Sequence, residues 1–223
     1  MKVLAYGIQI EVWGKYALFS RPEMKTERVS YDVITPSAAR GLIEAIYWHN
    51  GLKWVIDSIY VCNPIRFTNI RRNEVSQKIS ASNVREVMNG KNVPLYLNTS
   101  EAIQQRASLV LTDVRYIISA HFEMTAKANA ADTPEKFYAI TCERLKGGKN
   151  FMQPYFGCRE FPANIKLYEG ELPAPPEELQ GKKDLGYMLY DMDYSNPADI
   201  RPTFFRATLI DGMLNLKDCG VVS

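Results

Sequence analysis

The stretch ASLVLTDVRYIISAHFEM, residues 107–124, alternates in polarity over most of its length. One set of alternating positions is mostly apolar: Val110, Thr112, Val114, Tyr116, Ile118, Ala120 and Phe122. The other set is charged or polar: Asp113, Arg115, Ser119, His121 and Glu123. Because the side chains of a β-strand point alternately to opposite faces of its sheet, this pattern predicts one long strand with a buried face and a polar face.

A helix is predicted on each side of this strand, and each begins at a threonine followed by a proline. Upstream, TPSAARGLIEAIYWHN (residues 35–50) has Thr35 as N-cap and apolar residues at helical spacing. Downstream, TPEKFYAITCERLK (residues 133–146) starts in the same way at Thr133. Proline at the first helical position lacks an N–H that would be unsatisfied anyway, so both starts have a physical basis.

Further strands are predicted around these helices. Residues 2–12 alternate, residues 52–67 are strand-like with a break near Asn63–Pro64, and residues 151–170 contain one or two strands. The order is therefore β-α-β(β)-β-α-β. We predict an α+β fold of ferredoxin-like type, the split βαβ arrangement that RNA-recognition motifs also use.

Residues 73–106 lack a sustained apolar period and follow two cations, Arg71 and Arg72. A compact domain seldom contains so long an irregular segment unless it is functional, so we predict an extended hairpin or a mobile basic loop. A proline-rich joint, residues 171–183, precedes several short strands. The predicted domains are a ferredoxin-like domain over residues 1–168 and a small antiparallel β-rich domain over residues 169–223.

Composition restricts the class of protein. The chain has 223 residues, of which 46% are hydrophobic and 23% charged, and its net charge is only +2, so a nucleic-acid surface has to be a local patch. Its four cysteines are far apart and it has only two histidines, so no zinc motif, metal site or cofactor is predicted. Scattered thiols, no secretion signal and no apolar run of ~18–20 residues predict a soluble cytoplasmic protein without a membrane partner.

The second predicted helix ends in clustered cations and two glycines: Arg144, Lys146, Gly147, Gly148 and Lys149. One interpretation is a helix C-cap whose cations complement the helix dipole, and on the residues alone this is the more frequent case. The other is a loop whose backbone N–H groups and cations meet an RNA backbone. It is not a nucleotide-binding P-loop, because G-x-x-x-x-G-K-[ST] is absent.

Three side chains are candidates for chemistry. The pair Tyr47-Trp48 at a helix end closes a core more often than it acts in catalysis, although it could also stack on a base or move a proton. Lys136 on a polar helix face and His121 on a polar strand face are ordinarily a solvated lysine and a structural histidine. Metal-independent RNA cleavage would need only groups of these types, to orient the strand, move protons and stabilise charge.

Three segments carry a family resemblance: ALFSRPEMKTERVSYDVITPSAARGLIEAIYW (residues 17–48), PIRFTNIRRNEV (residues 64–75) and LKGGKNFMQPYFGCREFPA (residues 145–163). They closely resemble the fifth Cas family of CRISPR-associated proteins, in the Dvulg subtype that serves type I-C systems. The resemblance implies a member of the repeat-associated RNA-binding superfamily, with a ferredoxin-like domain and a small C-terminal β-sheet domain.

The resemblance also implies an activity. Dvulg members are endoribonucleases that cut the CRISPR precursor RNA within the repeat hairpin by metal-independent attack of a 2′-hydroxyl, and they remain as subunits of the interference complex. The family's active-site tyrosine and lysine fall on Tyr47 and Lys136. The family's histidine follows that lysine directly, and here the position is Phe137, which cannot transfer a proton. His121 is the first substitute candidate, because its strand runs toward the loop that begins the helix of Lys136.

The family's RNA-contacting loop falls on the glycine-rich stretch, so the predicted RNA contacts are Arg144, Lys146, Gly147, Gly148 and Lys149, together with Arg71 and Arg72. The predicted partners are repeat RNA or the processed guide RNA and the other subunits of the type I-C complex. The alternative function is a non-catalytic subunit that holds the 5′ handle of the guide RNA, which the loss of the histidine favours. A third alternative adds double-stranded DNA binding through the basic hairpin or the C-terminal domain.

Overall fold

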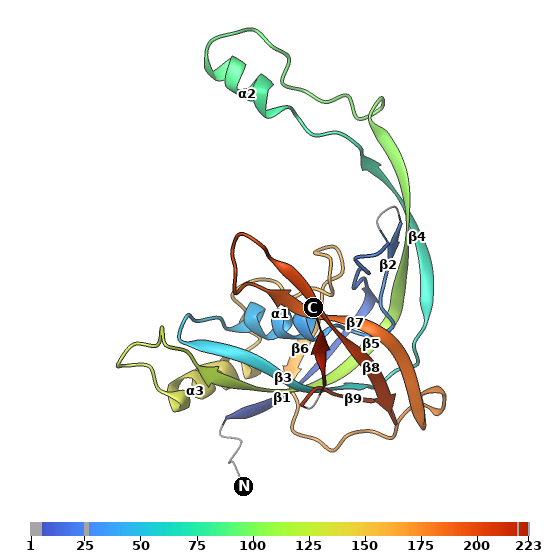
Figure 1. Ribbon diagram of the computed structural model, residues 1–223, viewed down its shortest axis with the longest axis vertical. Coiled ribbons are helices and arrows are strands. Elements are labelled where there is room, and N and C mark those ends of the chain that lie inside the picture. The colour runs from blue at the N-terminus through green and yellow to red at the C-terminus, as the bar shows by residue number, and fades with distance from the viewer. Residues whose placement is uncertain (1–5, 25–26, 218, 223) are drawn as a thin grey trace.

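The computed structural model describes residues 6–24, 27–217 and 219–222. Its elements in chain order are β1 (Gly7–Ala17), β2 (Arg28–Val29), α1 (Pro36–Ile46), β3 (Leu52–Val61), β4 (Phe67–Val75), α2 (Ala81–Met88), β5 (Ile103–Met124), α3 (Pro134–Lys146), β6 (Asn164–Leu167), the 3₁₀ turn η1 (Glu177–Leu179), β7 (Lys182–Asp193), β8 (Arg201–Ile210), β9 (Met213–Asn215) and β10 (Val221–Val222). The fold combines α-helices with a large, mostly antiparallel sheet (Figure 1).

The long strand β5 organises the sheet. It pairs antiparallel with β1, β3 and β4, and parallel with the short β2. Over the described residues the main path of the ten-stranded sheet is β10-β8-β9-β3-β5-β1-β6. The predicted alternation is confirmed, since Val110, Ile118 and Phe122 are buried. The strand predicted over residues 2–12 appears as β1, which extends to Ala17; residues 2–5 lie outside the described residues.

Both predicted helix starts are confirmed. The Thr35 hydroxyl accepts a hydrogen bond from the Ala38 backbone N–H at 3.2 Å, and the Thr133 hydroxyl accepts one from the Lys136 N–H at 3.3 Å. These threonines satisfy N–H groups that have no partner inside the helix. Helix α1 ends at Ile46, so Tyr47 is its extended C-cap residue and not part of the helix. One or two strands were predicted over residues 151–170, and the structure has one strand there, β6.

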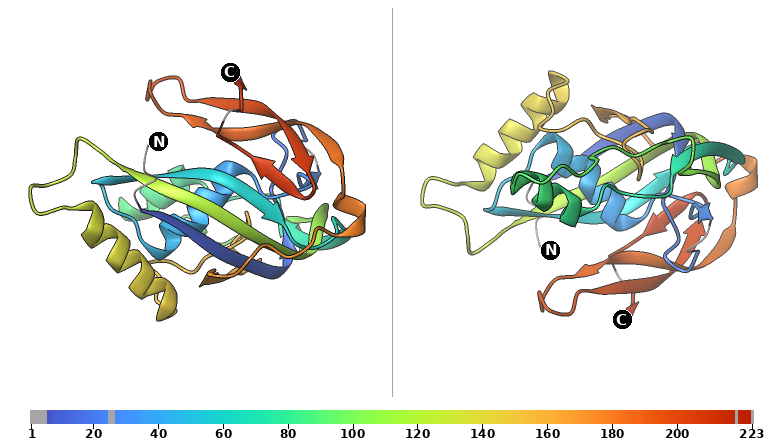
Figure 2. Two further views of the ribbon diagram at one scale, coloured as in Figure 1. Left: turned by 90° about the horizontal axis from the view of Figure 1, so that it is seen from below. Right: turned by 90° about the horizontal axis from the view of Figure 1, so that it is seen from above.

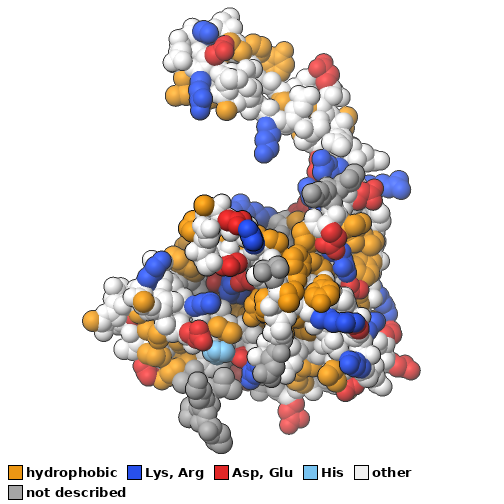
Figure 3. All heavy atoms as spheres, viewed as in Figure 1, with side chains coloured by type: hydrophobic (Ala, Val, Ile, Leu, Met, Phe, Trp, Pro, Cys, Tyr) orange, Lys and Arg blue, Asp and Glu red, His pale blue; other side chains and the backbone are white. Residues whose placement is uncertain are grey.

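The segment over residues 73–106 forms an extended arm. Strand β4 and the first part of β5 project from the body, and α2 lies at the tip (Figure 1). No residue of α2 is buried. The sequence predicted the hairpin but not α2. Val84 and Met88 lie four residues apart on one side of α2, and both are exposed. Two apolar positions are too few to indicate a buried helix face, so the sequence pattern did not predict this helix. Figure 3 shows the arm curving away from the body over an open hollow.

The C-terminal strands are joined to the body by strand pairing and by side-chain contacts. Strand β9 pairs with β3, and β7 packs beside α1, where Arg40 forms an ion pair with Asp191. The Leu189 N–H also donates to the Tyr31 hydroxyl at 3.3 Å. Figure 2 shows the β7–β8 hairpin and α3 on opposite sides of the central strands. Among the described residues, no helix is both long and apolar enough to cross a bilayer.

We expect opposite effects from two glycine-to-alanine substitutions, as measured by urea denaturation. Gly157 has φ +77°, and an added Cβ would lie 1.9 Å from the Leu18 carbonyl oxygen. Gly157→Ala should therefore lower the free energy of unfolding by at least about 1–3 kcal/mol, because an alanine there is strained and the contacting atom is backbone. Gly41→Ala is the control: its Cβ meets nothing within 4 Å in α1, so it should raise the free energy by about 0.5–1 kcal/mol. Similar losses in both variants would contradict this.

Candidate active site

Tyr47 is held at the junction of α1 and α3. The Arg144 guanidinium lies over its ring, 5.2 Å from the centroid, and also donates to the Ile46 carbonyl oxygen at 2.9 Å. The Trp54 indole N–H faces the Tyr47 carbonyl oxygen at 3.4 Å. Only 9% of Tyr47 is exposed. Arg144 therefore joins the last turn of α3 to the end of α1 and orients the tyrosine ring.

The surroundings of Tyr47 keep its hydroxyl protonated. Burial raises the pKa of Tyr47 above its usual value of 10.0, while the positive charges of Lys136 and Arg144 act in the opposite direction and Asp132 adds to the rise. A tyrosine whose pKa lies above 10 is a phenol at neutral pH, so it can donate a hydrogen bond or a proton.

Lys136 stands in the first turn of α3 and is anchored by the loop before it. Its ammonium lies 3.1 Å from Asp132 Oδ1 and 3.4 Å from the Ala131 carbonyl oxygen. The Asp132 side chain is only 4% exposed, whereas that of Lys136 is 48% exposed. A hydrogen bond from the Asn129 N–H and then one from Lys136 lower the pKa of Asp132, so the carboxylate stays ionised and fixes the ammonium while leaving it open to solvent.

His49 belongs to the same cluster, although the sequence analysis did not single it out. Its ring lies 4.9 Å from the Phe137 ring and 6.5 Å from the Tyr47 ring, and its Nε2 is 3.9 Å from Asp132 Oδ2. The signal that could have found it is its spacing: two residues after Tyr47 in an extended segment, a side chain returns to the same side of the chain.

The hydrogen bonding of His49 determines which nitrogen can act. The Gly51 backbone N–H points at Nδ1, 2.9 Å away, so Nδ1 is the acceptor and the neutral ring carries its proton on Nε2. In this state His49 can donate a hydrogen bond through Nε2, but it cannot take up a proton at Nδ1 without breaking the contact with Gly51.

Phe137, at the position where the resembled family has its histidine, is a core residue. It is 1% exposed and packs against Phe122 of β5 and Tyr47, with ring centroids 6.3 and 6.1 Å apart. This agrees with its place in the apolar stripe of its helix. Its ring packs against the rings of Tyr47 and His49 but has no group that can form a hydrogen bond.

His121 is not brought together with Tyr47 and Lys136. Its neighbour Phe122 packs against α3, so strand alternation directs His121 to the opposite face of the sheet. There its Nδ1 lies 3.0 Å from Asp57 Oδ2. The strand does run toward the loop before α3, but alternation places this side chain on the wrong face to reach that cluster.

The glycine-rich turn divides its cations between two tasks. Arg144 points inward to Tyr47, whereas Lys146 and Lys149 are each 64% exposed and pair with Glu169 and Glu143 at the surface. Gly147 caps α3, and Gly148 adopts φ +63°, a backbone conformation that favours glycine. The predicted cap is therefore present, and two lysines beside it remain accessible to a polyanion.

Arg71 and Arg72 lie on β4, at the base of the arm and not beside Tyr47. Arg71 is exposed. Arg72 forms an ion pair with Glu160, and its guanidinium lies 5.4 Å from the centre of the Phe161 ring. This cation therefore already has partners within the chain, as Lys146 and Lys149 do.

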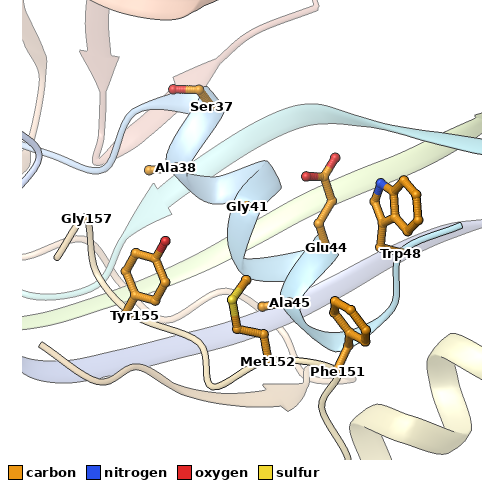
Figure 4. Close-up of a pocket in the computed structure, with 10 residues that line it drawn as sticks. All are labelled: Ser37, Ala38, Gly41, Glu44, Ala45, Trp48, Phe151, Met152, Tyr155 and Gly157. Carbon is orange, nitrogen blue, oxygen red and sulfur yellow. The ribbon is translucent and has the colours of Figure 1, made fainter. Parts of the chain in front are cut away.

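A pocket of about 470 Å³ lies between α1 and the segment that follows the glycine-rich turn. It is lined by Ser37, Ala38, Gly41, Glu44, Ala45, Trp48, Phe151, Met152, Tyr155 and Gly157 (Figure 4). Trp48 and Phe151 are 53% and 71% exposed. The described residues contain no group of three or more His, Cys, Asp or Glu side chains that could hold a metal ion.

Two relatives match the chain over most of its length. It is 46% identical over 217 residues to a protein of Mannheimia succiniciproducens named CRISPR pre-crRNA endoribonuclease Cas5d, covering 96% of each chain. It is 40% identical over 200 residues to a protein of the same name from Thermus thermophilus, covering 89% of this chain and 79% of the relative.

Solved structures share the fold. A functionally uncharacterized protein from Streptococcus mutans superimposes with a TM-score of 0.68 at 21% identity, covering 97% of both chains. A chain of a CRISPR RNA-guided surveillance complex gives a TM-score of 0.53 at 13% identity, covering 97% of this chain and 89% of the other. The family model described as CRISPR-associated protein (Cas_Cas5) matches residues 7–217 in its Cas5d form. The chain therefore belongs to the Cas5d family of CRISPR-associated proteins.

Proposed function

We propose that this protein is an endoribonuclease that cuts CRISPR precursor RNA within its repeat and then stays bound to the product as a subunit of the interference complex. The observation that carries the proposal is the identity of 46% and 40% to relatives named pre-crRNA endoribonucleases. The cluster of Tyr47, Lys136 and Asp132 supplies side chains suited to that reaction. A chain of the same fold occurs in a CRISPR RNA-guided surveillance complex, which supports the second role.

The chemistry proposed is transesterification without a metal ion. The 2′-oxygen forms a bond to the adjacent phosphorus as the bond to the 5′-oxygen breaks, which leaves a 2′,3′-cyclic phosphate and a 5′-hydroxyl. The 2′-hydroxyl loses its proton to solvent, and the leaving 5′-oxygen gains one. The Tyr47 phenol is protonated at neutral pH, and burial raises its pKa further; it is the proposed donor to that oxygen. We assign to the Lys136 ammonium the stabilisation of the negative charge on the phosphorane.

A third group is proposed from the position of His49. Its Nε2–H is free of the Gly51 contact that occupies Nδ1, and it lies on the same side as the pair of Lys136 and Asp132. We propose that His49 donates a hydrogen bond to a non-bridging phosphate oxygen. It would thereby take the role of the histidine that the resembled family has at the position of Phe137. The sequence-based candidate His121 would have to act from across the sheet.

The RNA contacts proposed outside this cluster are the lysines of the glycine-rich turn and the arm. Lys146 and Lys149 are exposed beside Gly148, and exposed lysines near a backbone turn suit phosphate contacts. Arg71 and Arg72 are proposed for a more distant part of the RNA, because they lie at the base of the arm.

The finer architecture is also proposed. We infer a ferredoxin-like domain over residues 1–168, since β6, β1, β5 and β3 follow one another antiparallel in that order and α1 and α3 fill the two crossovers. Residues 169–223 are assigned to the small C-terminal β-rich domain. A second candidate function, holding the guide RNA without cutting it, is favoured by a single observation, the buried Phe137.

We expect Tyr47→Phe to slow single-turnover cleavage of the cognate repeat RNA in EDTA by roughly 10²–10⁴-fold, the range for losing a proton-transfer group. Binding of the RNA should change little, because the ring and its packing remain. Lys136→Ala should also abolish most cleavage, while Lys53→Ala, an exposed lysine on β3, is the matched control. Cleavage that needs an added divalent cation would refute the metal-free mechanism, and RNA binding without any cleavage by the wild type would establish the second candidate function.

Cleavage rates of variants under the same conditions show which of the two histidines takes part in the reaction. His49→Ala should slow cleavage by roughly 10-fold or more, the cost of losing a donor to the phosphate, and His49→Gln should restore part of the rate, since its amide also donates. His121→Ala should leave the rate unchanged, because His121 faces Asp57 on the other side of the sheet. The reverse result, a slow His121 variant and a normal His49 variant, would show that the sequence-based candidate was right.

A further inference from the structure

We propose that the pocket between Trp48, Glu44 and Phe151 is a subsite for one unpaired nucleobase of the repeat RNA, and that guanine fits it best. This inference rests on the proposed function, because it assumes that the RNA passes Tyr47. The pocket's volume of about 470 Å³ lies within the range of about 300–1,000 Å³ typical of ligand sites.

The position of the pocket connects it to both proposed RNA contacts. The chain leaves Gly148 and reaches Phe151 and Met152, whose backbone N–H groups both donate to the Ala45 carbonyl oxygen, at 2.8 and 3.0 Å. This pins the segment after the glycine-rich turn against the last turn of α1. The pocket is therefore lined by residues that directly follow the glycine-rich turn and by Trp48, the neighbour of Tyr47, so an RNA strand that contacts both the lysines and the tyrosine runs close to it.

The aromatic side chains supply the surface on which a base can stack. The large rings of Trp48 and Phe151 are 53% and 71% exposed, although burying such surface is favourable. Figure 4 shows both rings at one end of the pocket, with Tyr155 at the other end. Unpaired bases stack readily on aromatic side chains, which is how proteins usually hold single-stranded RNA. A base at this end of the pocket would cover the exposed rings.

Glu44 supplies the chemical selectivity. Its carboxylate stands at the same end of the pocket as Trp48 and Phe151 (Figure 4), and the Arg40 Nε lies 3.4 Å from its Oε1. An ionised carboxylate only accepts hydrogen bonds. The Watson–Crick edge of guanine presents two adjacent donors, N1–H and the N2 amino group, which match the two carboxylate oxygens. Uracil presents one N–H between two carbonyl oxygens, and these would repel the carboxylate.

Two charged groups act on the Glu44 carboxylate. Arg40 from the same helix attracts it, and Asp191 from β7, which pairs with Arg40, repels it. Burial raises the pKa of Glu44. A base that donates two hydrogen bonds to the carboxylate would offset this cost of burying its charge. Guanine recognition therefore satisfies a group that the free protein leaves only partly paired.

The first arm of the test measures binding of the cognate repeat RNA with 2′-O-methyl riboses, which cannot attack the phosphate. Trp48→Ala should weaken binding roughly 10-fold, the loss of about one stacked base. Trp13→Ala is the matched control, an exposed tryptophan on β1 whose ring lies near Lys166. It should bind within about twofold of the wild type. Thermal unfolding of both variants should match the wild type, because both rings are partly in solvent.

The second arm identifies the base. Each unpaired guanine of the repeat is replaced in turn by inosine, which lacks only the N2 amino group. At one position this should weaken binding by the wild type several-fold, and the same replacement should have no further effect on Glu44→Gln or Trp48→Ala, because contacts that act through one site are not additive.

The possible results distinguish a failure of the base subsite from a failure of the proposed function. If the wild type cleaves the unmodified repeat but Trp48→Ala binds as tightly as Trp13→Ala, the pocket holds no base and only this inference is overturned. A loss with Trp48→Ala that no inosine position reproduces would likewise overturn it, because the rings would then contact the RNA without reading a guanine. Failure of the wild type to bind the repeat at all would overturn the proposed function together with the subsite.

Discussion

One continuous strand, β5, constrains both the body and the arm of this protein. Its first half pairs with β4 in the arm, and its second half lies between β1 and β3 in the body. Side chains alternate between the two faces along a strand. The face on which one β5 side chain lies therefore determines the face of its neighbours along the strand. Phe122 packs under α3, which puts His121 beyond reach of Lys136. The separation of the chain's two histidines thus follows from this alternation.

The candidate active site depends on a second constraint, the junction of the two main helices. Arg144 of α3 binds the end of α1 through the Ile46 carbonyl oxygen and covers the Tyr47 ring. The start of the same helix carries Lys136, held by the nearly buried carboxylate of Asp132. One helix therefore positions the tyrosine from its last turn and supplies the lysine from its first. Two of the side chains assigned to the chemistry depend on the packing of α3, and neither is held by a flexible loop alone.

Local signals in the sequence were sufficient for the elements but not for the contacts between them. The threonine caps at Thr35 and Thr133 and the alternation of residues 107–124 depend on neighbours within a few positions, so each was predictable and each is confirmed. Helix α2 was missed because its apolar residues meet no core. The spacing of His49 from Tyr47 was a local signal, but its place beside Phe137 results from a contact across 88 positions of sequence, which no local pattern reports.

In the function and the subsite proposed above, the last turn of α1 and the residues just after it combine chemistry with recognition. Over residues 44–49 the chain presents Glu44 and Trp48 to the pocket, and Tyr47 and His49 to the cluster around Asp132. Tyr47 and Trp48 are adjacent, so a base seated on the indole brings its own phosphates close to the phenol. In the proposed complex, the distance between the base and the cleaved bond is set by a short piece of backbone. The Ala45 and Ile46 carbonyl oxygens at its start accept hydrogen bonds from the Phe151 and Met152 N–H groups and from Arg144. A site built in this way needs fewer groups that move protons, because holding the phosphate in the right geometry supplies much of the rate. This is a physical reason why a member of the family can carry Phe137 in place of a histidine.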